Sequence, residues 1–164
     1  MPATGEAFLE RAAQLLSASL GKIREAVQLL SDDETWSRPN AASNSIGNLL
    51  LHLSGNVRQH VICGLTGAPD TRDRPAEFST QGGRTKAELL SLLESTVAEA
   101  VAAIRSLPPE RLLEEALIQG KAVRFLDDLF TIVEHFGYHA GQIVLIVKAA
   151  KNHGFPWYRH LDPK

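Results

Sequence analysis

The sequence predicts an all-α protein, and three observations support that fold class. Leu and Ala, which are strong helix formers, dominate the composition. Apolar residues recur in four long segments with the period of one apolar face per helix. Stretches rich in Gly, Pro and Asp separate these segments. The 164 residues fit one domain, residues 1–164, and four such helices would pack as a four-helix bundle.

The first helix is expected over residues 7–30, where Leu16, Ile23 and Val27 fall on one apolar stripe. An acidic stretch follows. Pro39 prevents the helix from continuing through it, because proline lacks the backbone N–H that a helix interior needs.

The second helix is expected over residues 45–65, with Ser43 or Asn44 as its N-cap. Gly64 and Gly67 are candidate stops, because glycine readily takes the left-handed conformation that ends many helices. This helix carries most of the polar residues that matter for function.

The segment 67–84 is rich in Gly, Pro, Asp, Thr and Arg and shows no helical period. Loops of this length in compact domains are usually functional lids or mobile segments. The third helix is expected over residues 86–107, because Thr85 and Glu88 form a capping box and Pro108 follows.

Residues 112–125 form an ambiguous connection, in which Gln119 and Gly120 resemble the turn of a short hairpin. The fourth helix is expected over residues 126–152. Acidic residues in its first turn and basic residues in its last turn suit the helix dipole, and Gly154 is a candidate left-handed cap.

The aromatic tail, residues 155–164, is expected to pack on the bundle. Short loops would give an up-down-up-down antiparallel order. The long stretches before the third and fourth helices also permit a crossover connection.

Charge and composition exclude several classes of function. The net charge is −2 and no basic stripe is interleaved with aromatics, so nucleic-acid binding is not expected. No apolar run of about 18 residues is present, and the first residues lack the apolar core of a secretory signal. The single Cys63 cannot form an internal disulfide, which favours a cytoplasmic location. It is expected to be a small buried residue rather than a nucleophile.

A histidine pair is the strongest chemical signal. His135 and His139 are four residues apart, so both imidazoles project from one face of the fourth helix. Ile132 and Ile143 share that face, which indicates that it points inward. Two nitrogens so placed can reach one metal ion. The alternative is a solvated or hydrogen-bonded pair without a metal.

A row of polar residues along the second helix, which we call the polar seam, could supply a third ligand. Asn48, His52, Asn56 and His60 recur every four residues among apolar neighbours. Such a seam is costly to bury unless each group finds a partner. His52 plus the pair makes three nitrogen ligands with an open position, the pattern of a catalytic metal. His60 is expected to leave the site, since about 100° per residue turns it about 80° from the His52 direction.

Several of these residues have a simpler reading. His52 alone is more often a hydrogen-bonded core histidine. Asn48, Asn56 and Gln142 are candidates for orienting ligands or water. Arg58 could hold an anionic group of a substrate, although an arginine on a helix is more often solvated.

Two segments together resemble the signatures of the DinB-like superfamily (damage-inducible B). Residues 45–53, SIGNLLLHL, resemble the first signature, with His52 in the middle of the second helix. Residues 134–143, EHFGYHAGQI, resemble the second, a histidine pair followed by Gly-Gln. Residues 55–59 resemble one uncharacterised branch. The resemblance spans essentially the whole chain.

The resemblance implies an antiparallel four-helix bundle with a crossover connection. It also implies that His52, His135 and His139 bind a divalent metal ion such as Zn²⁺ or Ni²⁺. Characterised members include thiol S-transferases that use bacillithiol or mycothiol, and a maleylpyruvate isomerase. A metal-dependent transferase is therefore expected. It would activate a low-molecular-weight thiol for attack on an electrophilic small-molecule substrate held under residues 67–84.

Two other functions remain open, a metal-dependent hydrolase and a non-catalytic, stress-related metal-binding bundle. The resemblance also implies a homodimer. The third helix agrees with this, because its apolar residues spread over more than the roughly 100° that one core contact needs. The tail could instead cover that surface within the same chain.

Overall fold

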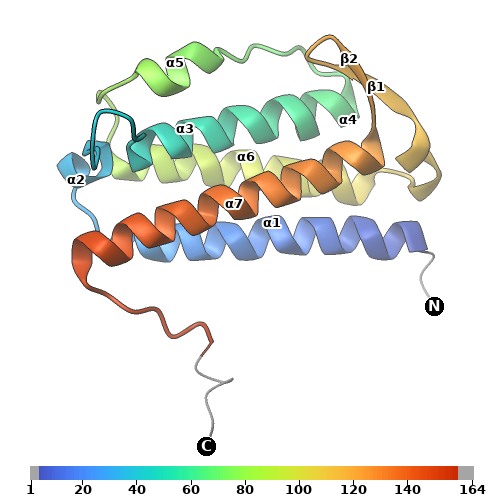
Figure 1. The fold of residues 1–164 in the computed structure, drawn as a ribbon. Coiled ribbons are helices and arrows are strands. Elements are labelled where there is room, and N and C mark those ends of the chain that lie inside the picture. Colours follow the sequence, from blue (N-terminus) through green and yellow to red (C-terminus); the bar gives the residue numbers. More distant parts are fainter. Residues whose placement is uncertain (1–3, 159–164) are drawn as a thin grey trace, which may run out of the picture.

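The computed structural model describes residues 4–158 and shows four long helices side by side, with short elements at both ends of the bundle (Figure 1). The long helices are α1 (Thr4–Gln28), α3 (Ile46–Val57), α6 (Lys86–Ser106) and α7 (Phe125–Lys151). α3 continues through a π-helical segment, η1 (Arg58–Cys63), into α4 (Gly64–Thr66). The all-α bundle predicted from apolar periodicity is confirmed.

The direction of the helices identifies the crossover. α1 and α7 run one way, whereas α3 and α6 run the other way (Figure 1). Ion pairs agree: Arg105 at the end of α6 lies 2.9 Å from Glu10 at the start of α1, and Lys151 at the end of α7 lies 2.6 Å from Glu34. Residues 67–85 return along the bundle, so α3 and α6 are parallel neighbours. We call residues 67–85 the crossover segment.

The crossover segment contains a helix that its composition did not predict, α5 (Arg74–Ser79). The Asp73 side chain accepts a hydrogen bond from the backbone N–H of Ala76, and Pro75 lies in the first turn, where its missing N–H costs nothing. The expectation of a segment without helix was wrong here, because a helix of this length is too short to show a period.

N-terminal caps fix where two long helices begin. The expected cap of α3 at Ser43 or Asn44 was wrong: Ser45 caps the helix and forms a capping box with Asn48. The predicted capping box at Thr85, which starts α6, is confirmed. Both starts therefore follow from local side-chain hydrogen bonds.

Left-handed residues end two helices. Gly67, with φ 74°, ends α4 as expected, whereas Gly64 lies inside the helix. The cap of α7 is Asn152, with φ 48°, rather than the expected Gly154. Asparagine is one of the few residues that tolerate this conformation.

The ambiguous connection between α6 and α7 forms a short 3₁₀ turn, η2 (Pro109–Leu113), and a hairpin of β1 (Glu115–Ile118) and β2 (Lys121–Arg124). Its turn residues, Gln119 and Gly120, have φ of 52° and 76°. Two left-handed residues match the tight turns that join antiparallel strands.

One apolar core fills the space among the four long helices. Leu50 and Leu53 on α3, Leu93 on α6 and Phe136 on α7 are fully buried in it. A further short helix, α2 (Asp32–Trp36), closes the end at which α3 and α6 begin. No described helix is long and apolar enough to cross a membrane.

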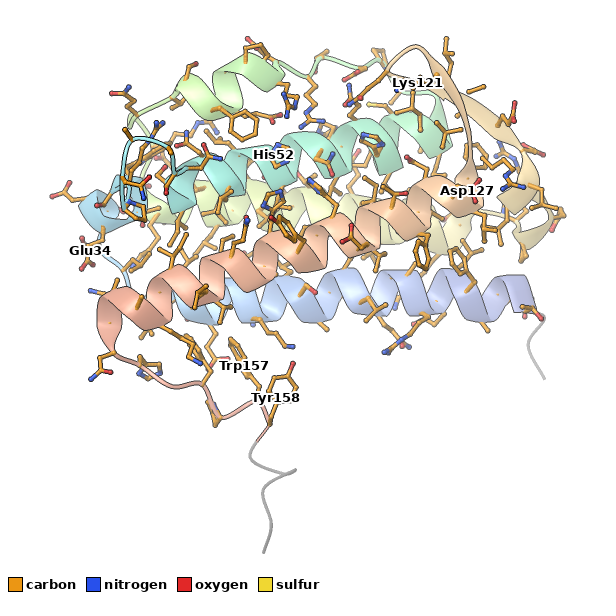
Figure 2. All side chains as sticks on the ribbon, viewed as in Figure 1. Glu34, His52, Lys121, Asp127, Trp157 and Tyr158 are labelled. Carbon is orange, nitrogen blue, oxygen red and sulfur yellow. The ribbon has the colours of Figure 1, made fainter. Side chains whose placement is uncertain are left out.

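The described part of the tail packs on α1. Trp157 donates a hydrogen bond to Glu25 at 2.5 Å, and Lys22 donates one to Tyr158 at 2.7 Å. Figure 2 labels both aromatic residues in the tail that follows α7. Residues 159–164 of the expected tail contact lie outside the described residues.

Candidate metal centre

His52, His135 and His139 meet in the middle of the bundle. His52 lies halfway along α3, where Figure 2 labels it, and only 5% of it is exposed. His135 and His139 lie on α7, which runs antiparallel to α3 and places them opposite His52. The apolar faces of both helices bring these polar side chains together, because burying those faces fixes which residues point inward.

The three imidazoles converge on one point through their Nε2 atoms. The Nε2 atom of His135 lies 3.2 Å from that of His52 and 3.2 Å from that of His139. One ligand nitrogen from each ring lies within 4.8 Å of the others. Three nitrogens at such distances can ligate one ion without any helix moving far.

Two hydrogen bonds determine which nitrogens face the centre. The Nδ1 atom of His52 lies 2.9 Å from Oε2 of Glu77. A carboxylate only accepts, so Nδ1 donates and the neutral ring has its lone pair on Nε2. The Nδ1 atom of His139 donates in the same way to Oε1 of Gln142, at 2.7 Å. Both lone pairs therefore point inward.

His135 cannot satisfy both neighbours. Its Nε2 atom could donate to His52 or to His139, but an N–H group serves only one of two acceptors so far apart. Its Nδ1 atom is buried and has no hydrogen-bond partner among the described residues. Lone pairs that converge on one point repel one another, and a divalent cation among the three Nε2 atoms would compensate that repulsion. The donor set therefore fits a divalent metal.

The same environment keeps the rings of His135 and His139 neutral, as ligation requires. Burial, with the added repulsion of His139 and His52 in their charged forms, lowers the pKa of His135 to about 4. Burial also lowers the pKa of His139, partly opposed by its hydrogen bond to Gln142. Both imidazoles are thus neutral near pH 7, each with one ring nitrogen free of a proton.

Glu77 is itself fixed by Arg72, and neither residue was predicted from the sequence. The guanidinium binds the carboxylate at 2.7 Å and 2.9 Å through two N–H groups. Burial raises the pKa of Glu77. Hydrogen bonds from Arg72 and His52 lower this pKa by more than burial raises it, so the net shift is downward. Arg72 Nη2 also lies 3.2 Å from Nδ1 of His52. Both of these nitrogens are donors, so they cannot bond each other, and the N–H of Nη2 donates to Glu77.

The three candidate orienting residues have different surroundings. Gln142 contacts His139 directly. Asn48 instead holds the crossover segment, donating to the backbone oxygens of Glu77 at 2.9 Å and of Thr80 at 2.7 Å. Asn56 is buried, and its Oδ1 atom has no hydrogen-bond partner among the described residues.

Arg58 pairs with a residue of α6 rather than with a histidine. It forms an ion pair with Glu99 of α6 at 2.6 Å, and 45% of its side chain is exposed. The simpler reading of a solvated helix arginine fits this position, so Arg58 has no contact with the metal centre.

His60 lies outside the cluster of three, as predicted, but it still faces α7. Its Nδ1 atom lies 2.8 Å from Oδ1 of Asp128. The π-helical segment η1 explains this, because its wider turn rotates the chain less per residue than an α-helix does.

Cys63 is half-buried and is not one of the three grouped residues. Burial and the nearby Asp70 raise the pKa of its thiol. A protonated thiol is a poor nucleophile, as expected from the sequence, although the residue is only half-buried and not fully buried as expected.

A cavity of about 430 Å³ lies between α3, α5 and α6, next to the metal centre. Glu77 and Arg72 form part of its wall, together with Arg58 and Arg84. The described residues that line it include none of the three histidines. The Glu77–Arg72 pair thus separates this cavity from the cluster.

Comparisons with known proteins agree with this description. Residues 3–159 match the family described as "Protein of unknown function (DUF1572)". No curated protein matches the sequence.

Solved structures show the same fold at low identity. A DinB-like protein from Bacillus subtilis, YjoA, has a TM-score of 0.70 and 20% identity over 90% of this chain and 96% of its own. A conserved protein from Enterococcus faecalis has a TM-score of 0.72 and 14% identity over 88% of this chain and 97% of its own. A mutant of a mycothiol-dependent maleylpyruvate isomerase has a TM-score of 0.64 and 18% identity over 87% of this chain and 68% of its own.

These identities are low enough that the solved structures show the fold alone. The family match covers nearly the whole chain. The protein therefore belongs to the DUF1572 family, and its fold is that of the DinB-like proteins.

Proposed function

We propose that the protein binds one divalent cation through His52, His135 and His139 and works as a metal-dependent thiol S-transferase on an electrophilic small molecule. The observation that carries the proposal is the inward direction of the Nε2 atoms, fixed at His52 by Glu77 and at His139 by Gln142.

The protein side chains prepare the site before any ligand enters. Glu77 and Gln142 hold protons at Nδ1, which keeps the inward lone pairs free. Three protein ligands leave a coordination position open. When bound, a divalent cation supplies a positive charge that favours the thiolate form of a coordinated thiol. Phe78 covers one side of the site, with its ring 4.9 Å from that of His52.

The choice of a thiol rests on two observations. One structural neighbour is named as mycothiol-dependent. The chain's own cysteine is unsuited to be the nucleophile, because burial raises the pKa of Cys63 and the residue lies outside the cluster. A low-molecular-weight thiol from a reducing cytoplasm would fill this role.

Two measurements test the proposal. Elemental analysis of the purified protein should find about one divalent metal ion per chain. A screen of low-molecular-weight thiols with electrophilic substrates should show turnover that stops when a chelator removes the metal. Absence of bound metal would reject the site, and turnover of esters or amides without thiol would favour a hydrolase.

A further inference from the structure

Gly55 leaves space on α3 for a side chain of the crossover segment. A Cβ atom built at Gly55 would lie 2.0 Å from Oε1 of Glu77 and 3.2 Å from Nε of Arg72. Real Cβ atoms essentially never lie within 3.0 Å of such an atom, so the Glu77 carboxylate would have to shift. The Glu77–Arg72 pair therefore rests directly on the backbone of α3, and only glycine permits this contact.

The same carboxylate is the link between the crossover segment and a metal ligand. Oε2 of Glu77 binds Nδ1 of His52, while Oε1 faces Gly55 and Arg72. Only 7% of Glu77 is exposed. Other hydrogen bonds also hold this segment to the bundle, such as those of Asn48 to backbone oxygens and those of Gln59 to the side chains of Asp70 and Arg72, but these bonds involve no histidine.

We propose that Glu77 is a positioning residue for His52, and that closure of the crossover segment and metal binding are coupled through it, with Gly55 as the position that lets it close. The metal half of this inference rests on the proposed metal site. The contact between Gly55, Glu77 and His52 can be tested without any metal.

The physical reason is that His52 needs an acceptor at Nδ1 to keep its Nε2 lone pair in the centre. If the crossover segment lifts, Glu77 leaves and the ring is free to rotate or to exchange tautomers. Metal affinity then falls. Coupling between two equilibria is reciprocal, so a bound metal must in turn favour the closed segment.

The first experiment follows amide hydrogen exchange in the metal-free protein. Gly55→Ala should speed exchange across α5, because the added methyl group displaces the Glu77 carboxylate. Gly21→Ala is the matched control: Gly21 is also inside a long helix, but a Cβ there meets nothing within 4 Å. Exchange in α5 as slow in Gly55→Ala as in the wild type overturns the inference.

The second experiment measures Zn²⁺ affinity by competition with a chromophoric chelator. Glu77→Ala and Gly55→Ala should each weaken binding by about 10- to 100-fold, the usual effect of losing an outer partner of a ligand. The double variant should bind no more weakly than Glu77→Ala alone, because Gly55 acts only through that carboxylate. Glu77→Gln, which keeps an acceptor, should lose less than Glu77→Ala.

Different results separate this inference from the proposed function. Tight Zn²⁺ binding by the wild type with additive or absent effects of the variants rejects the coupling and leaves the metal site intact. Zn²⁺ should also slow exchange of α5 in the wild type. A wild type that binds no Zn²⁺ rejects the coupling together with the metal site, while the metal-free exchange data still decide whether Gly55 lets Glu77 close on His52.

Discussion

His52 and His60 lie eight residues apart on the same polar seam, and each binds a carboxylate through Nδ1, at 2.9 Å and 2.8 Å. The difference is the side from which the carboxylate comes. Glu77 belongs to the crossover segment, so the Nε2 atom of His52 faces α7 and His135. Asp128 belongs to α7 itself, so the Nε2 atom of His60 faces the hairpin.

The hairpin offers His60 no ligand partner. The nearest polar group described for its Nε2 atom is the side-chain amide of Gln119, at 3.4 Å. A carboxylate partner at Nδ1 is therefore not enough to bring a histidine into the cluster of three. The direction of the free nitrogen decides this, and the position of the outer carboxylate sets that direction.

The largest expected effect separates the two histidines by metal content. His135→Ala should abolish stoichiometric metal, because the central ring of the cluster is lost. His60→Ala should keep a full metal content. Elemental analysis of both variants, purified identically, measures this. Equal metal loss in the two variants would erase the distinction drawn above.

The second expected effect concerns stability, and here His60 is the histidine whose loss should matter. His60→Ala leaves the carboxylate of Asp128 buried without its partner, which should lower the free energy of unfolding by about 2 kcal/mol. Chemical denaturation measures it, with His153→Ala, at an exposed position, as the control. A stability equal to that of the wild type would mean that His60 and Asp128 do not depend on each other.

A smaller effect tests the cysteine near His60. Because the pKa of Cys63 is raised, a smaller fraction is thiolate at pH 8 than in the unfolded chain, where the pKa is ordinary. Alkylation by iodoacetamide should therefore be severalfold slower in the folded protein, and its rate should go on rising above about pH 8.5, the ordinary pKa of a cysteine. A fast, pH-independent reaction would reveal an activated thiol and weaken the case for an external one.

The last prediction concerns dimerisation, which should affect His52 and His60 least. We predict a homodimer because apolar side chains are exposed on the outer face of α7. Phe130, Tyr138 and Leu145 are 68%, 59% and 67% exposed. Light scattering at micromolar concentration measures the mass, and a value near the 17.9 kDa of one chain would contradict the dimer.

Much of the fold and the cluster could be predicted because the signals are local. Apolar periodicity predicted the four long helices, and the spacing of His135 and His139 placed both on one face. The hairpin turn at Gln119 and the capping box at Thr85 were also local patterns.

Other features could not be predicted from local patterns. Glu77 lies 25 residues from His52, in a segment whose only helix has six residues. A polar seam indicates that His52 needs a partner, but it gives no information on which residue supplies it. The π-helical turn that keeps His60 facing α7 likewise has no periodic signal.

The sequence by itself determined which residues form the four long helices and which faces these helices bury, because helix periodicity and capping act over a few residues. It thereby brought His52, His135 and His139 to inward positions. The tertiary structure decided which way the nitrogens point. That depends on the path of the crossover segment over α3 and on the contact at Gly55, and both involve residues that only packing brings together.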